Sequence, residues 1–110
     1  MKDVYRTANI YVGDFLAGKL KETETGYSFQ YESDYLAKEN STPVSLTLPL
    51  KEEEYQSKIL FPFFDGLIPE GWLLNVVSKN WKINQSDRFG ILLVACKDPI
   101  GNVYIKEELK

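Results

Sequence analysis

The sequence predicts an α+β fold: a small antiparallel sheet (a meander, partly barrel-like) followed by a short helical cluster and a closing strand. Three observations predict it. β-branched and aromatic residues separated by turn residues dominate the first third of the chain, apolar residues at helical spacing dominate the second half, and a short strand-like run comes last. The chain has 110 residues, 44% of them hydrophobic and 26% charged, so we expect a single domain over residues 1–110.

The sheet is expected to begin with three strands joined by tight turns. Gly13-Asp14 and Thr25-Gly26 supply the turn residues between them. The third strand alternates strictly, which places Tyr27, Phe29 and Tyr31 on one face. The three predicted strands span residues 4–12, 15–21 and 27–31.

The middle of the chain is less regular. Residues 33–38 are predicted to form a short helical turn capped by Ser33, with a loop over residues 39–43. Residues 45–50 alternate again, which favours a strand that Pro49 ends or confines to a sheet edge. Three glutamates fall within residues 51–58, which we expect to form a solvated surface segment.

The second half is predicted to be helical until the closing strand. One short helix is expected within residues 61–68, and an amphipathic helix over residues 70–81. Ser86-Asp87 is typical of a cap for a third helix that begins at Arg88. Turn residues at 98–99 and 101–102 then precede the last strand, in the run NVYIKEE.

The residue inventory argues against catalysis. The chain has no histidine, no glycine-rich phosphate loop and one cysteine without a partner, so we expect no enzyme, cofactor or metal site. A net charge of −3 and the absence of long apolar runs argue against direct nucleic-acid and membrane binding. No signal peptide is visible, which favours a cytoplasmic protein.

Trp72 is the aromatic residue that pattern alone singles out. It falls at the edge of the apolar stripe of the helix over residues 70–81, where a large aromatic can anchor a protein interface. Packing at the rim of the chain's own core explains the same position equally well. Phe63 and Phe64 present the same choice, with the core favoured. Asp65 is better explained as a local acceptor for backbone amides than as an acid–base group.

Three segments resemble one known family. The runs LTLPL (46–50), PFFDGLIPEG (62–71) and FGILLVACKDPIGNV (89–103) are similar to the N-terminal subdomain of the HipA family, and the likeness covers nearly the whole chain. Cys96 falls where that family often has glycine, and Asn102 replaces a small residue. These departures concern local turn geometry.

The resemblance implies a function through other proteins. HipA proteins are serine/threonine kinase toxins of bacterial toxin–antitoxin systems, and their ATP-binding motifs lie downstream of this subdomain. In one branch the subdomain is a separate small protein, HipS, which partners a HipT-type kinase and a HipB-type DNA-binding protein. The chain therefore resembles a HipS-type antitoxin that inhibits a HipT-type kinase by docking near its active site.

The resemblance also suggests which residues make the contact. We expect the two glycines and the proline of the run FDGLIPEGW to bend the backbone and present a rigid partner-binding edge. Two other interpretations stay open: the chain is an N-terminal fragment of a full HipA-type kinase, or it is an assembly scaffold for a DNA-binding partner without kinase inhibition. The predicted contact residues are Phe64, Asp65, Pro69, Glu70, Gly71 and Trp72.

Overall fold

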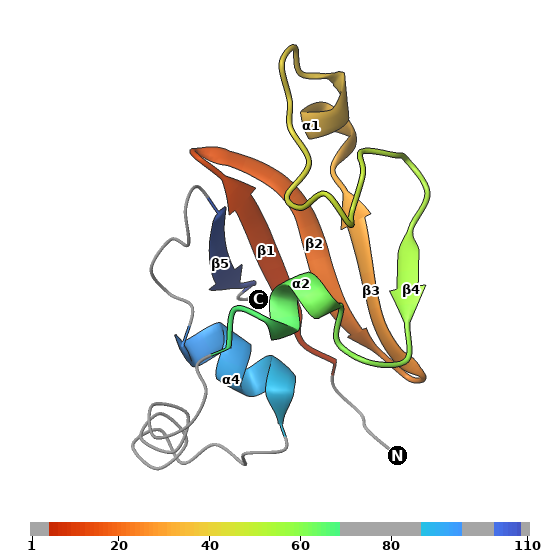
Figure 1. Cartoon of the computed structure of the whole chain (residues 1–110), viewed down its shortest axis with the longest axis vertical. Coiled ribbons are helices and arrows are strands. Elements are labelled where there is room, and N and C mark those ends of the chain that lie inside the picture. Colours follow the sequence, from red (N-terminus) through yellow and green to blue (C-terminus); the bar gives the residue numbers. More distant parts are fainter. Residues whose placement is uncertain (1–4, 69–86, 96–102, 109–110) are drawn as a thin grey trace.

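An antiparallel sheet of five strands organises the protein (Figure 1). The structure, a computed structural model, describes residues 5–68, 87–95 and 103–108. The predicted helix over residues 70–81 and the turns at 98–99 and 101–102 lie outside these ranges. The described elements are β1 (Thr7–Val12), β2 (Phe15–Thr23), β3 (Gly26–Tyr31), α1 (Ser33–Ala37), β4 (Tyr55–Ser57), α2 (Pro62–Asp65), α4 (Arg88–Ala95) and β5 (Val103–Glu107).

The sheet is an open meander with the closing strand added at one edge. Its order is β4-β3-β2-β1-β5, and every neighbouring pair is antiparallel. The predicted α+β class, the meander and the closing strand are confirmed, and among the described residues the sheet is open and not closed into a barrel. Because β5 pairs with β1 on the side away from β2, with Ile10 opposite Ile105, three strands separate the two edge strands.

Glycines make both predicted hairpin turns. Gly13, between β1 and β2, has φ 61°, a left-handed conformation that glycine adopts without a steric cost. Gly26 begins β3 with φ 152°, and a Cβ there would lie 2.2 Å from the Ser57 carbonyl oxygen of β4. These two positions therefore fix where β1, β2 and β3 reverse direction.

Three local expectations differ from the structure. Glu32 rather than Ser33 is the N-cap of α1, and no side chain caps it. Residues 45–50 form no strand, because the Leu48 amide bonds to the Ser45 carbonyl and closes a turn. The helix expected within residues 61–68 covers only Pro62–Asp65.

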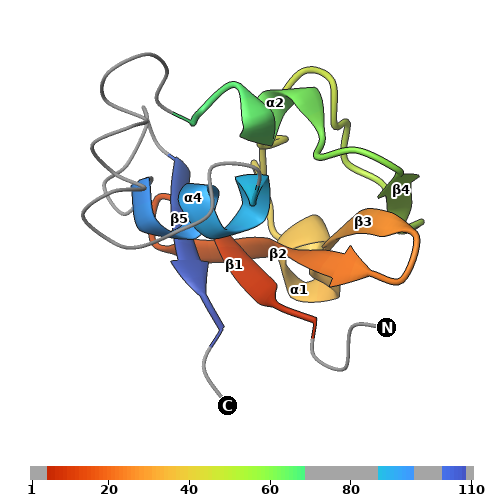
Figure 2. The same ribbon diagram turned by 90° about the horizontal axis from the view of Figure 1, so that it is seen from below.

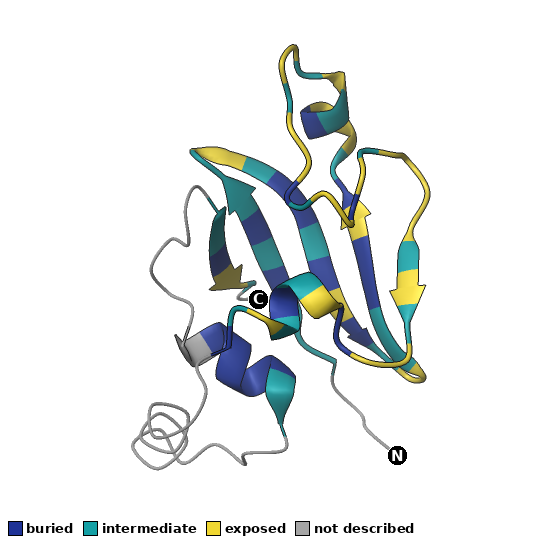
Figure 3. Ribbon diagram, in the orientation of Figure 1, coloured by how far each residue is buried: buried dark blue, intermediate teal, exposed yellow. Residues whose placement is uncertain are grey.

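The hydrophobic core lies between the sheet and the helices α2 and α4, which cover one of its faces (Figure 2). Buried and partly buried positions alternate along the first part of β1, and β3 ends with the exposed Gln30 between the buried Phe29 and Tyr31 (Figure 3). The Phe29 ring is central: its centroid lies 4.9 Å from that of Tyr31 and 5.6 Å from that of Phe64. Sheet and helix residues that share this core are Ala8, Ile10, Leu20, Phe29, Ile105, Phe64, Phe89, Ile91 and Leu92.

Two negative findings apply to the described ranges only. No helix in them is long and apolar enough to span a bilayer. No three histidine, cysteine, aspartate or glutamate side chains in them gather as ligands for a metal ion.

Candidate partner-binding edge

Helix α2 forms the start of the predicted partner-binding edge. Pro62 occupies its first turn, where a fixed φ and a missing amide donor cost nothing. After the helix, the Leu67 amide bonds to the Phe64 carbonyl at 3.0 Å and the Ile68 amide to the Asp65 carbonyl at 3.1 Å. Ile68 is buried in the core. The chain therefore arrives at residue 69 from a hydrogen-bonded turn that the core anchors.

Phe64 lies in the core and not on an exposed edge. Its side chain is fully buried, and its ring packs edge-on against that of Phe63 with the centroids 5.2 Å apart. Phe63 is partly buried against the same cluster. The core placement that the sequence favoured for Phe64 is therefore the one in the structure. Its ring can support the edge from below, but it is not presented to a partner in this conformation.

Asp65 pairs with an arginine on another helix. The Nε of Arg88, the first residue of α4, donates to Asp65 Oδ1 at 2.8 Å. The two side chains are 35% and 42% exposed, respectively. The expected bonds from local backbone amides to this carboxylate are replaced by a tie between α2 and α4.

Gly66 does not supply the predicted bend. Its backbone is right-handed helical, with φ −68° and ψ −15°, a conformation that any residue adopts. A Cβ at this position would lie 3.2 Å from the Pro62 carbonyl oxygen, so closeness to the helix is the constraint there. The other predicted contact residues, Pro69, Glu70, Gly71 and Trp72, lie outside the described residues.

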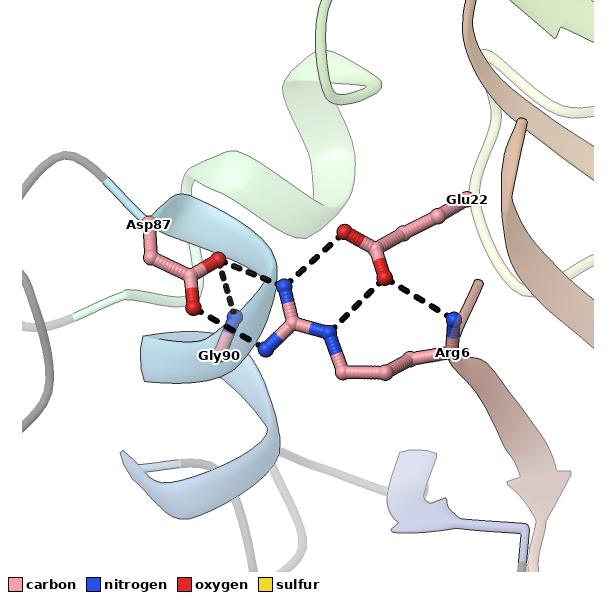
Figure 4. A network of polar contacts seen from close by, with 4 residues as sticks. All are labelled: Arg6, Glu22, Asp87 and Gly90. Carbon is pink, nitrogen blue, oxygen red and sulfur yellow. Dashed lines mark hydrogen bonds and ion pairs between the residues drawn. The ribbon is translucent and has the colours of Figure 1, made fainter. Parts of the chain in front are cut away.

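Asp87 caps helix α4, as predicted. Its carbonyl oxygen accepts from the Ile91 amide at 3.0 Å, and its Oδ1 accepts from the Gly90 amide at 3.1 Å. The other predicted cap residue, Ser86, lies outside the described ranges. The same carboxylate also binds Arg6, so the cap is part of a larger network (Figure 4).

Arg6 links the sheet to the start of α4. Its guanidinium donates from Nε and Nη2 to the two carboxylate oxygens of Glu22, at 2.8 and 2.9 Å, and from Nη1 and Nη2 to those of Asp87, at 2.9 and 2.6 Å (Figure 4). It also lies over the Phe89 ring, 5.2 Å from the centroid. The hydrogen bond from Arg6 lowers the pKa of Asp87, and the bonds from Glu22 and Asp87 raise the pKa of Arg6.

Four residues thus form what we call the anchored base: Asp65 and Ile68 on one side, Asp87 and Arg88 on the other. The Asp65–Arg88 ion pair joins the two sides, burial holds Ile68, and Arg6 ties Asp87 to the sheet. Residues 69–86 connect Ile68 to Asp87 along the chain. Residues 69–86, which include most of the predicted edge, are therefore carried between two fixed and connected points.

Sequence reasoning missed Arg6, Glu22 and Arg88. A signal existed for Glu22: it falls at an even step from Leu20 along β2, on the inward face, where a charged side chain needs a cation. Its side chain is only 8% exposed. No pattern pointed to Arg88, because its partner lies 23 residues earlier in another helix.

The open sheet, the helices on one face and the anchored base define a small α+β domain. The ion pairs and hydrogen bonds of its described residues connect the helices to one another and to the sheet. The model of the HipA N-terminal domain family matches residues 8–106. The chain belongs to the HipA N-terminal domain family, as the resemblance of its sequence motifs suggested.

Individual relatives agree with this assignment. A solved structure described as the N-terminal domain of HipA toxin superimposes with a TM-score of 0.75 at 32% identity, covering 100% of this chain and 99% of that one. An uncharacterized protein of Haemophilus influenzae is 36% identical over 109 residues, which is 98% of both chains. The "Putative kinase Y4mE" of Sinorhizobium fredii is 27% identical over 88 residues, and the match covers 79% of this chain but only 21% of that protein.

Proposed function

We propose that this chain is a HipS-type antitoxin, which binds a HipT-type serine/threonine kinase toxin near its active site and inhibits it in the bacterial cytoplasm. The observation that carries the proposal is the pattern of relatives. The same domain corresponds to 21% of a putative kinase and to 98% of an H. influenzae protein. This domain therefore occurs both as one part of a putative kinase and as nearly the whole of a small protein. Such a domain is suited to act on a kinase as a separate chain.

The anchored base supports the choice of contact residues. An interface segment that leaves from fixed points loses less conformational freedom on binding than one that leaves from a free terminus. Trp72 lies four residues after the buried Ile68, within reach of this support. In the proposal, Trp72 is the central anchor and Pro69, Glu70 and Gly71 shape its approach.

Asp65 has a second role in the proposal. Its carboxylate is bound to Arg88 through one oxygen, and its side chain is partly exposed. It can therefore accept a hydrogen bond from the kinase while it holds α2 against α4. Phe64 acts indirectly, by keeping α2 seated on the core.

Inhibition follows from where the tryptophan is placed. We favour entry of Trp72 into, or against, the kinase cleft, where it blocks productive closure of the lobes. The other route is docking that holds the lobes in an inactive arrangement. A HipB-type DNA-binding protein is a further proposed partner of the complex.

The proposal is tested by neutralisation in cells. Trp72→Ala should weaken rescue of growth when the chain is co-expressed with a HipT-type kinase, because a central tryptophan anchor contributes about 2–4 kcal/mol. Phe15→Ala is the matched control, since it removes an exposed aromatic side chain in the β1–β2 hairpin. Rescue by Trp72→Ala at wild-type strength, with equal expression, overturns the anchor assignment.

One observation favours a second candidate. Because the match to the putative kinase of S. fredii covers only 21% of that protein, the sequence also fits the N-terminal part of a longer HipA-type kinase. Sequencing the gene to its stop codon separates the stand-alone antitoxin from the N-terminal part of a longer kinase. An open reading frame that continues into ATP-binding motifs would replace the antitoxin by an accessory domain in the same chain.

A further inference from the structure

Leu46 is the most exposed large hydrophobic residue in the described part of the chain. It is 93% exposed, compared with 69% for Ile59 and 51% for Phe15. Its neighbours Val44 and Leu48 are both buried in the core. Residues 44–48 thus hold both sides of a turn inside the protein and place Leu46 between them in solvent.

Hydrogen bonds fix the backbone of this turn. The buried Tyr31 hydroxyl accepts from the Val44 amide at 3.1 Å and donates to the Leu48 carbonyl. Within the turn, the Leu48 amide bonds to the Ser45 carbonyl at 3.0 Å, and the Thr47 amide bonds to Ser45 Oγ at 3.2 Å. We call residues 44–48 the tyrosine-braced turn.

A second tyrosine holds the approach to the turn. The Tyr35 hydroxyl accepts from the Thr42 amide at 3.2 Å and donates to the Thr42 carbonyl at 2.6 Å. Its ring stacks on that of Tyr31, with an interplanar angle of 8° and centroids 6.2 Å apart. Leu46 is therefore presented by a preorganised backbone, which lowers the entropy cost of contact with another molecule.

The segment of chain on either side of Leu46 carries no charge. Residues 40–50 contain no charged side chain, although 26% of the whole chain is charged. The exposed Pro43 and Pro49 lie on either side of the turn in the sequence, and we call Pro43, Leu46 and Pro49 together the apolar knob. Burying this knob removes no charge from water, so a concave apolar pocket is the receptor that matches it.

We propose that the apolar knob docks into an apolar pocket on the HipT-type kinase, as a second anchor in addition to the partner-binding edge. This inference rests on the proposed function. A stable protein complex buries about 800 Å² per partner, and one tryptophan supplies roughly 250 Å² at most. The complex therefore needs contacts beyond Trp72, and the knob is the best preorganised apolar feature among the described residues.

Two other occupants fit less well. A second copy of the chain offers a poor match: one cavity of about 640 Å³ is lined mainly by polar and acidic groups such as Gln30, Glu32 and Glu52, and another of about 220 Å³ has Glu32, Asp34 and Lys38 in its wall. A bilayer surface is the other alternative. Residues 40–50 hold no lysine or arginine, so the attraction to anionic lipid that supports such binding is missing at the knob.

The inference is tested by titrating the purified HipT-type kinase with the full chain. Leu46→Ala should raise the dissociation constant roughly tenfold, as truncation of an interface anchor does. Leu46→Met should keep it within about twofold, because it retains an apolar side chain of similar volume. Ile59→Ala is the matched control and should bind like the wild type. All three should unfold at the wild-type temperature, since both positions are exposed.

The possible results separate this inference from the proposed function. If Leu46→Ala binds as tightly as the wild type while Trp72→Ala binds weakly, the knob is not an anchor and the antitoxin proposal stands. If the wild type does not bind the kinase, both proposals fail. If Leu46→Ala abolishes co-sedimentation with phosphatidylglycerol vesicles but leaves kinase affinity unchanged, the occupant is a bilayer and the inference is overturned.

Discussion

Arg88 and Asp65, 23 residues apart in sequence, form an ion pair of 2.8 Å that joins the start of α4 to the end of α2. The pair closes the anchored base from which residues 69–86 leave and to which they return. It therefore connects a feature of the fold to the proposed partner contact, because Trp72 belongs to the segment between Ile68 and Asp87.

Breaking this pair should affect binding more than stability. We expect Arg88→Met to change the free energy of unfolding by less than about 1 kcal/mol, since exposed ion pairs contribute little. The affinity for the kinase should nevertheless fall, because α2 and α4 lose their tie beneath the edge. Denaturant unfolding and calorimetric titration measure the two effects. Lys19→Met, which breaks the pair of Lys19 with Glu108, is the control and should leave the affinity for the kinase unchanged. Wild-type affinity in Arg88→Met would show that the anchored base does not support kinase binding.

Loss of Arg6 should be far more costly. Arg6→Met removes a cation from the buried carboxylate of Glu22 and from the Asp87 cap. We expect a loss of about 3 kcal/mol in the free energy of unfolding, as for other broken buried pairs. Urea denaturation of Arg6→Met and of the double variant Arg6→Met/Glu22→Leu measures it. The double variant should recover part of the loss, and a single variant of wild-type stability would contradict the network.

Gly90 should not tolerate a methyl group. A Cβ there would lie 2.3 Å from Asp87 Oδ2 and 2.8 Å from Arg6 Nη1. Alanine normally stabilises a helix interior relative to glycine by about 1 kcal/mol, but Gly90→Ala should destabilise by about 1–3 kcal/mol because the clash outweighs that preference. Gly66→Ala, where the added Cβ would approach the Pro62 carbonyl oxygen to 3.2 Å, is the comparison and should cost less. A Gly90→Ala chain with a raised melting temperature would show that the carboxylate moves aside freely.

Tyr31 should make the fold sensitive to alkaline pH. Burial raises the pKa of Tyr31 to about 12, from an ordinary value of 10.0. Between these values the folded state holds the proton more firmly than the unfolded state, so this contribution is complete below pH 10 and is lost as pH rises towards 12. Tyr31→Phe should reduce that slope. It should also cost about 1–3 kcal/mol near neutral pH, because the buried Val44 amide and Leu48 carbonyl lose their partner.

Stability curves of both chains from pH 8 to 12 check this prediction. The slope left in Tyr31→Phe reports the other groups with raised pKa values, Tyr55 and Lys19. Parallel curves would contradict the assignment, since they would mean that Tyr31 contributes no pH dependence.

The hairpins were predictable because their signals are local. Gly13 and Gly26 mark the turns, and strict alternation places Tyr27, Phe29 and Tyr31 on one face. The same alternation misled at residues 45–50, where Val44 and Leu48 are buried on either side of a turn. The difference comes from the Tyr31 hydroxyl, which satisfies the backbone of that turn from another element. Periodicity does not register such a contact.

The candidate site was predictable only in part, for a related reason. Asp87 was identified as a cap from its position before an apolar run, but the end of α2 at Asp65 was not, because the helix was expected over residues 61–68. The contacts that join these points were not visible in the sequence, because Arg6 and Asp87 are 81 residues apart. Long-range ion pairs leave no spacing pattern. The choice between core and surface for Phe64 likewise needed the packing of Phe29 against it.

The central claim is most directly tested by phosphotransfer from the purified HipT-type kinase at increasing concentrations of this chain. The account predicts that kinase activity falls towards zero as the chain saturates the kinase, and that Trp72→Ala shifts the midpoint to roughly 30-fold or more higher concentration. The chain alone should turn over no nucleotide. A kinase that keeps full activity at saturating chain would contradict the account.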